Sequence, residues 1–155
     1  MKIIIISDSH GGTDYMCDVI LEQEPNAVIH CGDHIRDARR ISENFPRVKF
    51  YMVAGNCDYV SSHEEEEQVF ELCGRRFFIT HGNLYGVKMG YTKLMYAAAE
   101  KGADFVICGH THIPKYDSFG DIVLINPGSV SYGRRSYGIL NLTEDSFDYK
   151  LEELR

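Results

Sequence analysis

The chain has 155 residues, of which 44% are hydrophobic and 25% are charged. A chain of this size corresponds to about one domain, and the composition excludes disordered, collagen-like and coiled-coil proteins. The 16 Lys and Arg residues against 23 Asp and Glu give a net charge of −7. Because no basic stripe offsets this charge, electrostatic binding of nucleic acids or anionic membranes is not expected. We therefore expect one globular domain over residues 1–155.

The cysteines and the N-terminal residues bear on the cellular compartment. The five cysteines include no Cys-x-x-Cys pair, so the sequence indicates neither a disulfide framework nor a cysteine zinc site and favours a reducing compartment. The apolar stretch at residues 3–6 is shorter than the apolar part of a signal peptide, which needs about 7–15 residues, and far shorter than a membrane span. We expect a cytoplasmic protein that does not bind membranes.

Nine short apolar runs, rich in β-branched and aromatic residues, predict strands. They are residues 3–6, 27–29, 48–53, 68–72, 76–79, 104–108, 122–125, 138–142 and 146–151. Helical spacing of apolar residues predicts helices over 14–24, 37–44 and 88–101. Strands that alternate with helices predict a largely parallel first half. The strand-rich second half predicts antiparallel additions or a second sheet packed on the first.

Polar residues follow directly behind six of the predicted strands. In chain order they are Asp8 and His10, Asp33, Asn56, His81, His110 and His112, and the Asn-Pro-Gly-Ser segment at 126–129. Ligands of open α/β sheets bind at the carboxyl edge of the strands. We therefore expect these side chains to meet at one sheet edge.

The residue types in this set point to metal ions. Alternate residues of an extended strand face the same side, so Asp8 with His10, and His110 with His112, can each direct two donors at one ion. Imidazole and oxygen donors suit Mn, Fe, Ni, Co or Zn. Seven ligands exceed the needs of one ion, whereas two ions about 3.5–4 Å apart, sharing a bridging carboxylate, would use them all. Asp33 is the candidate bridge. Three other histidines lack such a pairing and are expected to be structural: His30, His34 and His63.

The order of these motifs resembles that of the calcineurin-like metallophosphoesterases, which carry Asp-x-His, Gly-Asp, Gly-Asn-His-Asp/Glu, His and Gly-His-x-His. The corresponding segments are Asp8-Ser9-His10, Gly32-Asp33, Gly55-Asn56-Cys57-Asp58, His81-Gly82 and Gly109-His110-Thr111-His112. The closing segment at 126–129 extends the match, which looks like the compact YfcE-type branch of that superfamily. The resemblance implies an α/β fold of two packed mixed β-sheets flanked by helices.

The resemblance also implies how two ions and their ligands are arranged. One ion would be held by Asp8, His10, Asp33 and His112. The other would be held by Asp33, Asn56, His81 and His110. Members of this branch are typically phosphodiesterases that use Mn or Ni, with Fe, Co or Zn as alternatives. Two divalent ions and two carboxylates leave a local charge of about +2, which would attract an anionic substrate, and a water bridging the ions would supply hydroxide for attack on phosphorus.

The candidate catalytic residues, one of which (Asn56) is also a predicted ligand, match the family less evenly than the ligands do. Asn56 and Asp58 match the Gly-Asn motif and are candidate catalytic residues. Cys57 replaces the catalytic His of the family, and we expect this cysteine not to be essential. Asn83 stands where related sequences often carry a second His. Arg134, in the stretch after Asn-Pro-Gly-Ser, is either a phosphate contact or a residue of a surface turn.

Two other functions fit the same motifs. The retromer complex contains a small subunit of this fold that serves mainly in protein–protein assembly, so a scaffold is one alternative. A phosphomonoesterase or nucleotidase would differ from a phosphodiesterase only in its substrate. The complete set of seven ligands favours an enzyme acting on small phosphate esters. The sequence does not indicate the natural substrate or the oligomeric state.

Overall fold

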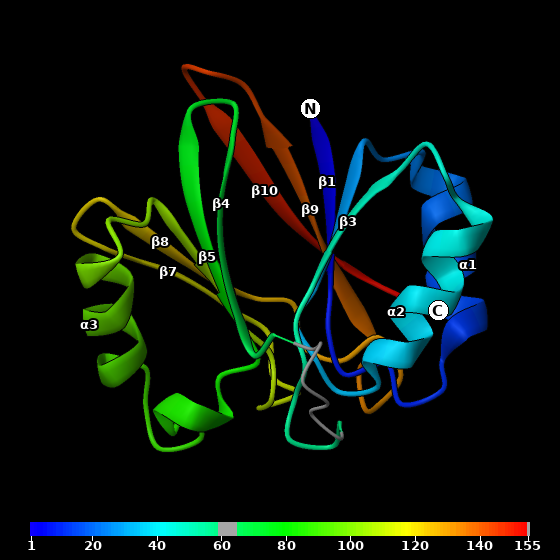
Figure 1. The fold of residues 1–155 in the computed structure, drawn as a ribbon, viewed down its shortest axis with the longest axis horizontal. Coiled ribbons are helices and arrows are strands. Elements are labelled where there is room, and N and C mark those ends of the chain that lie inside the picture. Colours follow the sequence, from blue (N-terminus) through cyan, green and yellow to red (C-terminus); the bar gives the residue numbers. More distant parts are fainter. Residues whose placement is uncertain (59–64, 155) are drawn as a thin grey trace.

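The computed structural model describes residues 1–58 and 65–154, which form two five-stranded β-sheets and three α-helices (Figure 1). The first sheet has the strand order β10-β9-β1-β2-β3, and the second has the order β4-β5-β6-β8-β7. The strands of the first sheet are β1 (Lys2–Ile6), β2 (Ala27–His30), β3 (Lys49–Met52), β9 (Ser136–Leu142) and β10 (Phe147–Glu153). Those of the second are β4 (Glu67–Leu72), β5 (Arg75–Thr80), β6 (Phe105–Ile107), β7 (Lys115–Phe119) and β8 (Ile122–Asn126).

Three parallel strands joined by helices, β1, β2 and β3, form one side of the first sheet. Helix α1 (Thr13–Gln23) connects β1 to β2, and α2 (Ile35–Asn44) connects β2 to β3. Four consecutive residues of β1, Ile3 to Ile6, are buried, as expected for a parallel strand covered on both faces. β9 and β10 extend the sheet in antiparallel pairing beside β1.

The second sheet also has a parallel centre, formed by β5, β6 and β8. A 3-10 helix (Asn83–Tyr85) and α3 (Thr92–Glu100) lie between β5 and β6. β4 and β7 run antiparallel at the two edges. Each sheet therefore contributes three parallel strands whose carboxyl ends point in one direction.

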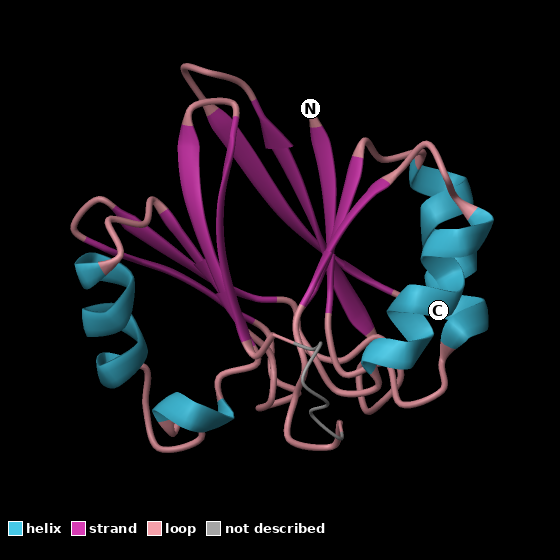
Figure 2. Ribbon diagram, in the orientation of Figure 1, coloured by secondary structure: helices cyan, strands magenta, loops and turns pink. Residues whose placement is uncertain are grey.

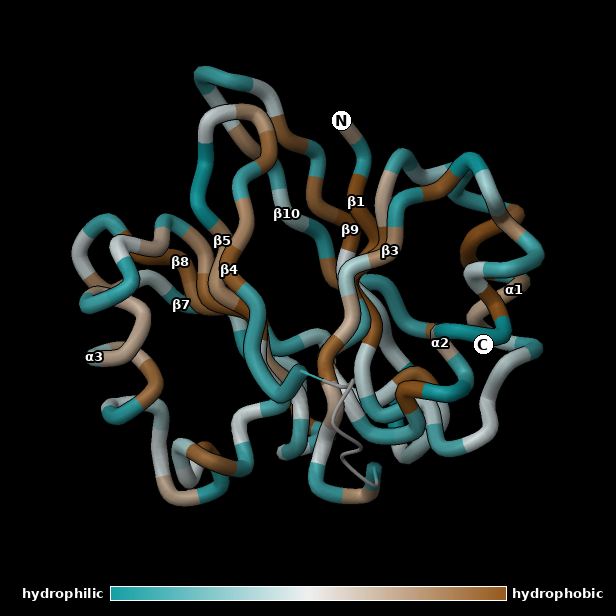
Figure 3. The backbone as a smooth tube through the Cα atoms, viewed as in Figure 1, coloured by the Kyte–Doolittle hydropathy of each residue, from teal (hydrophilic) through white to brown (hydrophobic). Residues whose placement is uncertain are grey.

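The two sheets pack face to face over an apolar core, and helices cover their outer faces. α1 and α2 lie against the first sheet and α3 lies against the second (Figure 2). Between the sheets, Tyr51, Phe70, Phe77 and Phe105 form a column of stacked rings with centroids 3.8–5.5 Å apart. Burying one such side chain contributes about 1.5–3 kcal/mol. Figure 3 shows hydrophobic residues concentrated in the strands and hydrophilic residues in the outer turns.

The structure confirms the expected α/β fold of two packed mixed sheets and the nine predicted strands. The sequence pattern does not predict β7, because Lys115–Phe119 is an edge strand with four exposed residues and no apolar run. The prediction of a helix from residue 88 is wrong: α3 begins at Thr92, because Gly90 has a φ of 142°, which a helix cannot contain. Among the helices of the described residues, none has the length and apolar character needed to cross a membrane.

Candidate metal centre

The predicted metal ligands lie beyond the carboxyl ends of parallel strands from both sheets. β1, β2 and β3 of the first sheet lead to Asp8 and His10, to Asp33 and to Asn56. β5 and β6 of the second sheet lead to His81 and to His110 and His112. The prediction of a single sheet edge is wrong, because two packed sheets bring two edges together. The loops after these strands gather at the lower end of the molecule in Figure 1.

The backbone at the paired ligands is not extended, so the argument from strand periodicity is also wrong. Asp8, His10, His110 and His112 have φ values of 55°, 42°, 68° and 58°. This is the left-handed region, which costs a non-glycine residue roughly 1–2 kcal/mol. β1 ends at Ile6, so the ligands converge because the chain turns after each strand. Strained backbone of this kind is concentrated at functional sites.

One oxygen of the buried Asp8 carboxylate is held by the protein, and the other has no hydrogen bond. Ser7 Oγ and the backbone N–H of His110 donate to Oδ2 at 2.6 and 3.1 Å. Oδ1 lies 3.0 Å from His112 Nε2 and 3.9 Å from His10 Nε2, and it is buried without a hydrogen-bond partner. A buried carboxylate oxygen in this state is costly unless a cation or donor occupies the space beside it.

The Asp33 carboxylate faces both groups of imidazoles. Its Oδ2 lies 3.5 Å from His10 Nε2, and its Oδ1 lies 3.4 Å from His81 Nε2. The backbone N–H of Cys57 donates to Oδ1 at 2.9 Å. Burial opposes ionisation of Asp33, but the hydrogen bonds from His81 and Cys57 outweigh it and hold the pKa well below its ordinary value. Asp33 is therefore an ionised carboxylate between two imidazoles, the position expected of a bridging ligand.

The His81 ring is fixed by a backbone hydrogen bond. Its Nδ1 donates to the carbonyl of Cys31 at 2.7 Å, and Nε2 faces Asp33 and lies 3.2 Å from His110 Nδ1. Metal-binding histidines commonly use one ring nitrogen in this way. Burial lowers the pKa of His81, but the hydrogen bond to Asp33 and the charge of Asp8 outweigh it and raise the pKa. The carboxylates around His81 Nε2 therefore stabilise a positive charge at this nitrogen.

Four predicted ligands form a compact group that fits a divalent metal ion. Nitrogens of His10 and His112 and carboxylate oxygens of Asp8 and Asp33 all lie within 4.8 Å of one another. His10 Nε2, like Asp8 Oδ1, is buried without a hydrogen-bond partner. Burial is the main reason that the pKa of His10 is lowered, so its imidazole is neutral and able to bind a metal at neutral pH. Nitrogen and oxygen donors of this kind suit divalent transition metals.

Two motif glycines leave the space that the carboxylates occupy. A Cβ on Gly109 would overlap Ser7 Oγ and lie 2.6 Å from Asp8 Oδ2. A Cβ on Gly55 would overlap Asp33 Oδ1. Any larger residue at either position would therefore displace a carboxylate of the group.

The turn after β3 carries two of the catalytic candidates. Asn56 and Cys57 are both exposed, and the amide of Asn56 lies 3.6 Å from Cys57 Sγ. Partial burial and a hydrogen bond from the thiol to Asp33 raise the pKa of Cys57. The thiol is therefore protonated at neutral pH.

The other two catalytic candidates have different surroundings. The Asp58 carboxylate accepts the backbone N–H of Gly55 at 2.8 Å and that of Ile35 at 3.0 Å, which fastens the turn to the first residue of α2. The Arg134 side chain is 86% exposed, and its guanidinium lies 3.6 Å from Glu153.

Two rings that the sequence pattern did not indicate lie against the group. Tyr132 meets His10 edge-on at 5.1 Å and stacks on His112 at 5.9 Å. The ring of His34, which we expected to be structural, lies 4.9 Å from that of His10. The only sequence signal was position: His34 directly follows Asp33, and Tyr132 lies three residues after Asn-Pro-Gly-Ser.

The fully buried His30 supports the turn at Ser9. The backbone N–H of Gly32 donates to His30 Nδ1 at 3.3 Å, and His30 Nε2 lies 3.1 Å from Ser9 Oγ. Ser9 in turn donates to Asp37 Oδ2 at 2.8 Å. Burial lowers the pKa of His30 to about 4, so the ring is neutral. His63 lies outside the described residues.

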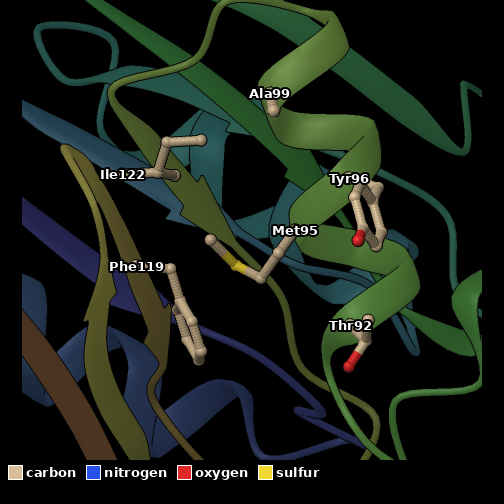
Figure 4. Close-up of a pocket in the computed structure, with 6 residues that line it drawn as sticks. All are labelled: Thr92, Met95, Tyr96, Ala99, Phe119 and Ile122. Atoms are coloured by element: carbon tan, nitrogen blue, oxygen red, sulfur yellow. The ribbon is translucent and has the colours of Figure 1, made fainter.

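An apolar pocket between α3 and the β7–β8 hairpin is separate from this group. It is lined by Thr92, Met95, Tyr96, Ala99, Phe119 and Ile122 (Figure 4). Ile122 begins β8, whereas Asn126 at the other end of the strand contacts Gly109, next to His110. None of the six lining residues is His, Cys, Asp or Glu, so we assign the pocket no part in the centre.

A comparison with models of known protein families identifies the family of this chain. The model of the calcineurin-like phosphoesterase superfamily domain matches residues 1–145. The chain belongs to this superfamily. The probable metallophosphoesterase YsnB of Bacillus subtilis is 35% identical over 153 residues, covering 94% of this chain and 87% of that protein. Phosphodiesterase YfcE of Escherichia coli K12 is 28% identical over 169 residues, covering 91% and 88%.

Solved structures agree with this calcineurin-like phosphoesterase fold. A predicted phosphoesterase from Streptococcus pneumoniae TIGR4 superposes with a TM-score of 0.82 at 30% identity, covering 98% of this chain and 88% of that one. A Vps29 single mutant from Entamoeba histolytica superposes with a TM-score of 0.79 at 18% identity, covering 100% of both chains. The likeness to Vps29 concerns the fold alone. These findings confirm the predicted resemblance, including the relation to YfcE.

Proposed function

We propose that this calcineurin-like phosphoesterase is a cytoplasmic phosphodiesterase that hydrolyses small phosphate esters with two divalent ions, Mn or Ni. One observation carries the proposal: Asp8 Oδ1 and His10 Nε2 are buried without hydrogen-bond partners inside a group of four metal-binding side chains. The naming of YfcE as a phosphodiesterase supports the choice of reaction.

The two ions would use the seven predicted ligands. In the first set are Asp8, His10, Asp33 and His112, and in the second are Asp33, Asn56, His81 and His110. When bound, such ions lower the pKa of a coordinated water to about 7 and stabilise the charge on phosphate oxygens. Asp33 has one oxygen toward each set.

The chain's own groups keep this arrangement rigid before substrate arrives. Asp8 Oδ2 is fixed by two donors, so only Oδ1 is available as a ligand. Tyr132 packs on the rings of His10 and His112 and limits their rotation. Preorganised ligands of this kind reduce the cost of reorganisation during the reaction.

The remaining candidates take secondary roles in the proposal. Asp58 is a positioning residue, because both of its oxygens accept backbone N–H groups. Cys57 presents a protonated thiol beside Asp33 in place of the family His. Arg134 is exposed at the surface and would contact only parts of a substrate outside the centre.

The test is hydrolysis of bis-p-nitrophenyl phosphate by chelated protein reloaded with Mn²⁺ or Ni²⁺. We expect turnover only after reloading, and a loss of at least about 100-fold in Asp33→Ala. Lys150→Ala, which removes an exposed charge on β10, is the control and should match the wild type. Turnover that survives chelation, or faster hydrolysis of p-nitrophenyl phosphate than of the diester, would contradict a metal-dependent phosphodiesterase.

The second candidate is the scaffold with little or no activity that fits the same motifs. A scaffold does not need the complete set of ligands, whereas this chain carries all seven. Metal-loaded protein that binds two ions and hydrolyses neither a diester nor a monoester would favour the scaffold.

A further inference from the structure

A second pocket, of about 400 Å³, lies beside the loop that carries His110 and His112. Its apolar walls come from Val87, Ile113, Pro114 and the ring of Tyr91. Lys88, Thr111 and Lys115 add polar groups to the lining. The volume lies in the range of pockets that bind small molecules, about 300–1,000 Å³.

A single amide joins this pocket to the metal centre. Asn126 Nδ2 lies 2.8 Å from the carbonyl oxygen of Gly109, 3.0 Å from Thr111 Oγ1 and 3.4 Å from the hydroxyl of Tyr91. Asn126 opens the Asn-Pro-Gly-Ser segment, which has no role among the predicted ligands. Asn126 therefore holds Tyr91 of the pocket at a fixed position relative to the loop that carries His110 and His112.

The pocket carries positive charge in a chain whose net charge is −7. Lys88 has no carboxylate within ion-pair distance among residues 1–58 and 65–154. Lys115 Nζ lies 3.1 Å from Asp117 Oδ2, and the Lys115 side chain is 43% exposed. Thr111, which lies between His110 and His112 in the chain, is one of the lining residues, so the pocket borders the metal centre.

We propose that this pocket is the subsite for the part of the substrate beyond the scissile phosphate, and that it selects nucleotide esters carrying a second phosphate. The apolar walls and the Tyr91 ring suit the face of a nucleobase, and the two ammonium groups suit a phosphate. The inference rests on the proposed phosphodiesterase activity, and it names the class of substrate.

The test compares two esters with the same reacting phosphate. One is the p-nitrophenyl ester of thymidine 5′-phosphate, and the other is the same ester with an additional 3′-phosphate. Both release nitrophenolate, so the reaction at phosphorus is the same and only the distal phosphate differs. We expect the 3′-phosphate to raise kcat/KM about tenfold, mainly through a lower KM.

The lysine variants connect this preference to the pocket. Lys88→Ala and Lys115→Ala should each lower the preference about threefold, and the double variant should treat the two esters alike. Lys88→Arg should keep most of the preference. Lys150→Ala is the matched control, because it removes the same charge from β10, and its preference should equal that of the wild type. The ratio between two esters cancels differences in metal loading.

Calorimetry supplies a readout that does not depend on turnover. Metal-loaded wild type should bind thymidine 3′,5′-bisphosphate more tightly than thymidine 5′-phosphate, Lys88→Ala should reduce this affinity ratio about threefold, and the double lysine variant should abolish it. If both esters are hydrolysed equally well, or if the preference survives in the double lysine variant, the subsite is overturned and the phosphodiesterase stands. If neither ester is hydrolysed but the lysine-dependent binding remains, the phosphodiesterase fails and the subsite stands. If the binding difference is also missing, both are overturned.

Discussion

The buried His30 makes the stability of this fold depend on pH. The side chain is 0% exposed, and burial lowers its pKa from 6.5 to about 4. The unfolded chain therefore binds a proton below about pH 6.5, whereas the folded chain binds it only below about pH 4. The stability from the neutral ring is present above pH 6.5 and is lost as the pH falls through this window. At pH 5, which is about 1.5 units below the pKa of the unfolded chain, protonation of His30 in the unfolded state lowers the free energy of unfolding by about 2 kcal/mol.

The assay is urea unfolding followed by circular dichroism at pH 7.5 and pH 5, with EDTA present to remove metal linkage. His30→Asn does not titrate, and its amide oxygen can accept the N–H of Gly32. Between pH 7.5 and pH 5, the free energy of unfolding of the wild type should fall by about 2 kcal/mol more than that of the variant. The pKa shifts of His10, His81 and His110 are present in both proteins. Their contributions therefore cancel when the variant is subtracted from the wild type.

Two controls exclude other causes of the pH dependence, namely the titration of carboxylates and an effect specific to the Asn side chain. Asp33 has an ordinary pKa of 3.8 in the unfolded chain, so its lowered folded pKa matters only at more acid pH. His30→Gln should show the same flat dependence as His30→Asn, whatever the stability of either variant at pH 7.5. For each variant, the unfolding free energy of the wild type minus that of the variant is compared at pH 7.5 and pH 5. If this difference is the same at both pH values for both variants, the reasoning from the burial of His30 is refuted.

The metal centre leads to four further expectations. Asp33→Ala should empty both metal sites and Asn56→Ala mainly one, as measured by metal analysis; one ion per chain, unaffected by Asp33→Ala, would contradict a shared carboxylate. Chelation should lower the Tm by several degrees, since binding at 100 times Kd stabilises by about 2.7 kcal/mol, and chelated protein that is unfolded at room temperature would contradict a core that folds without metal. Gly109→Ala should lower both metal content and stability, the latter by about 1–3 kcal/mol, because its Cβ would displace Asp8; unchanged metal content would show that the loop adapts. Cys57→Ala should change aryl-diester turnover by less than about tenfold, and a loss of about 10³-fold at unchanged metal content would show that the thiol takes part in the chemistry.

Local patterns were enough to predict the strands that lead to the predicted ligands. The run Ile3–Ile6 predicts a strand, and the structure has one there in which these four residues are buried. The motif around Gly109 predicts ligands after a strand, and the glycine is needed because a Cβ would overlap Ser7 Oγ. In both cases the signal lies within a few neighbouring residues.

Other features depend on contacts that no local pattern encodes. The division of the predicted ligands between two sheets follows from strand pairings over long separations in the sequence, such as β1 with β9. The contact of Tyr132 with His10 and His112 depends on how a loop folds back over another loop. The left-handed backbone at Asp8 is held by hydrogen bonds from distant residues, including Ser129 Oγ to the Asp8 carbonyl oxygen at 2.9 Å.

The pairing of β1 with β9 has a consequence for the order in which this protein is made. All seven predicted ligands have been translated once the ribosome passes His112, but β1 lacks one of its two neighbouring strands until residues 136–142 emerge. Ile4 lies opposite Ile139 in that pairing, and contacts of such separation form late. β9 therefore completes the sheet that positions Asp8 only after every predicted ligand has emerged, and we expect the nascent chain before that point to lack the finished frame around them.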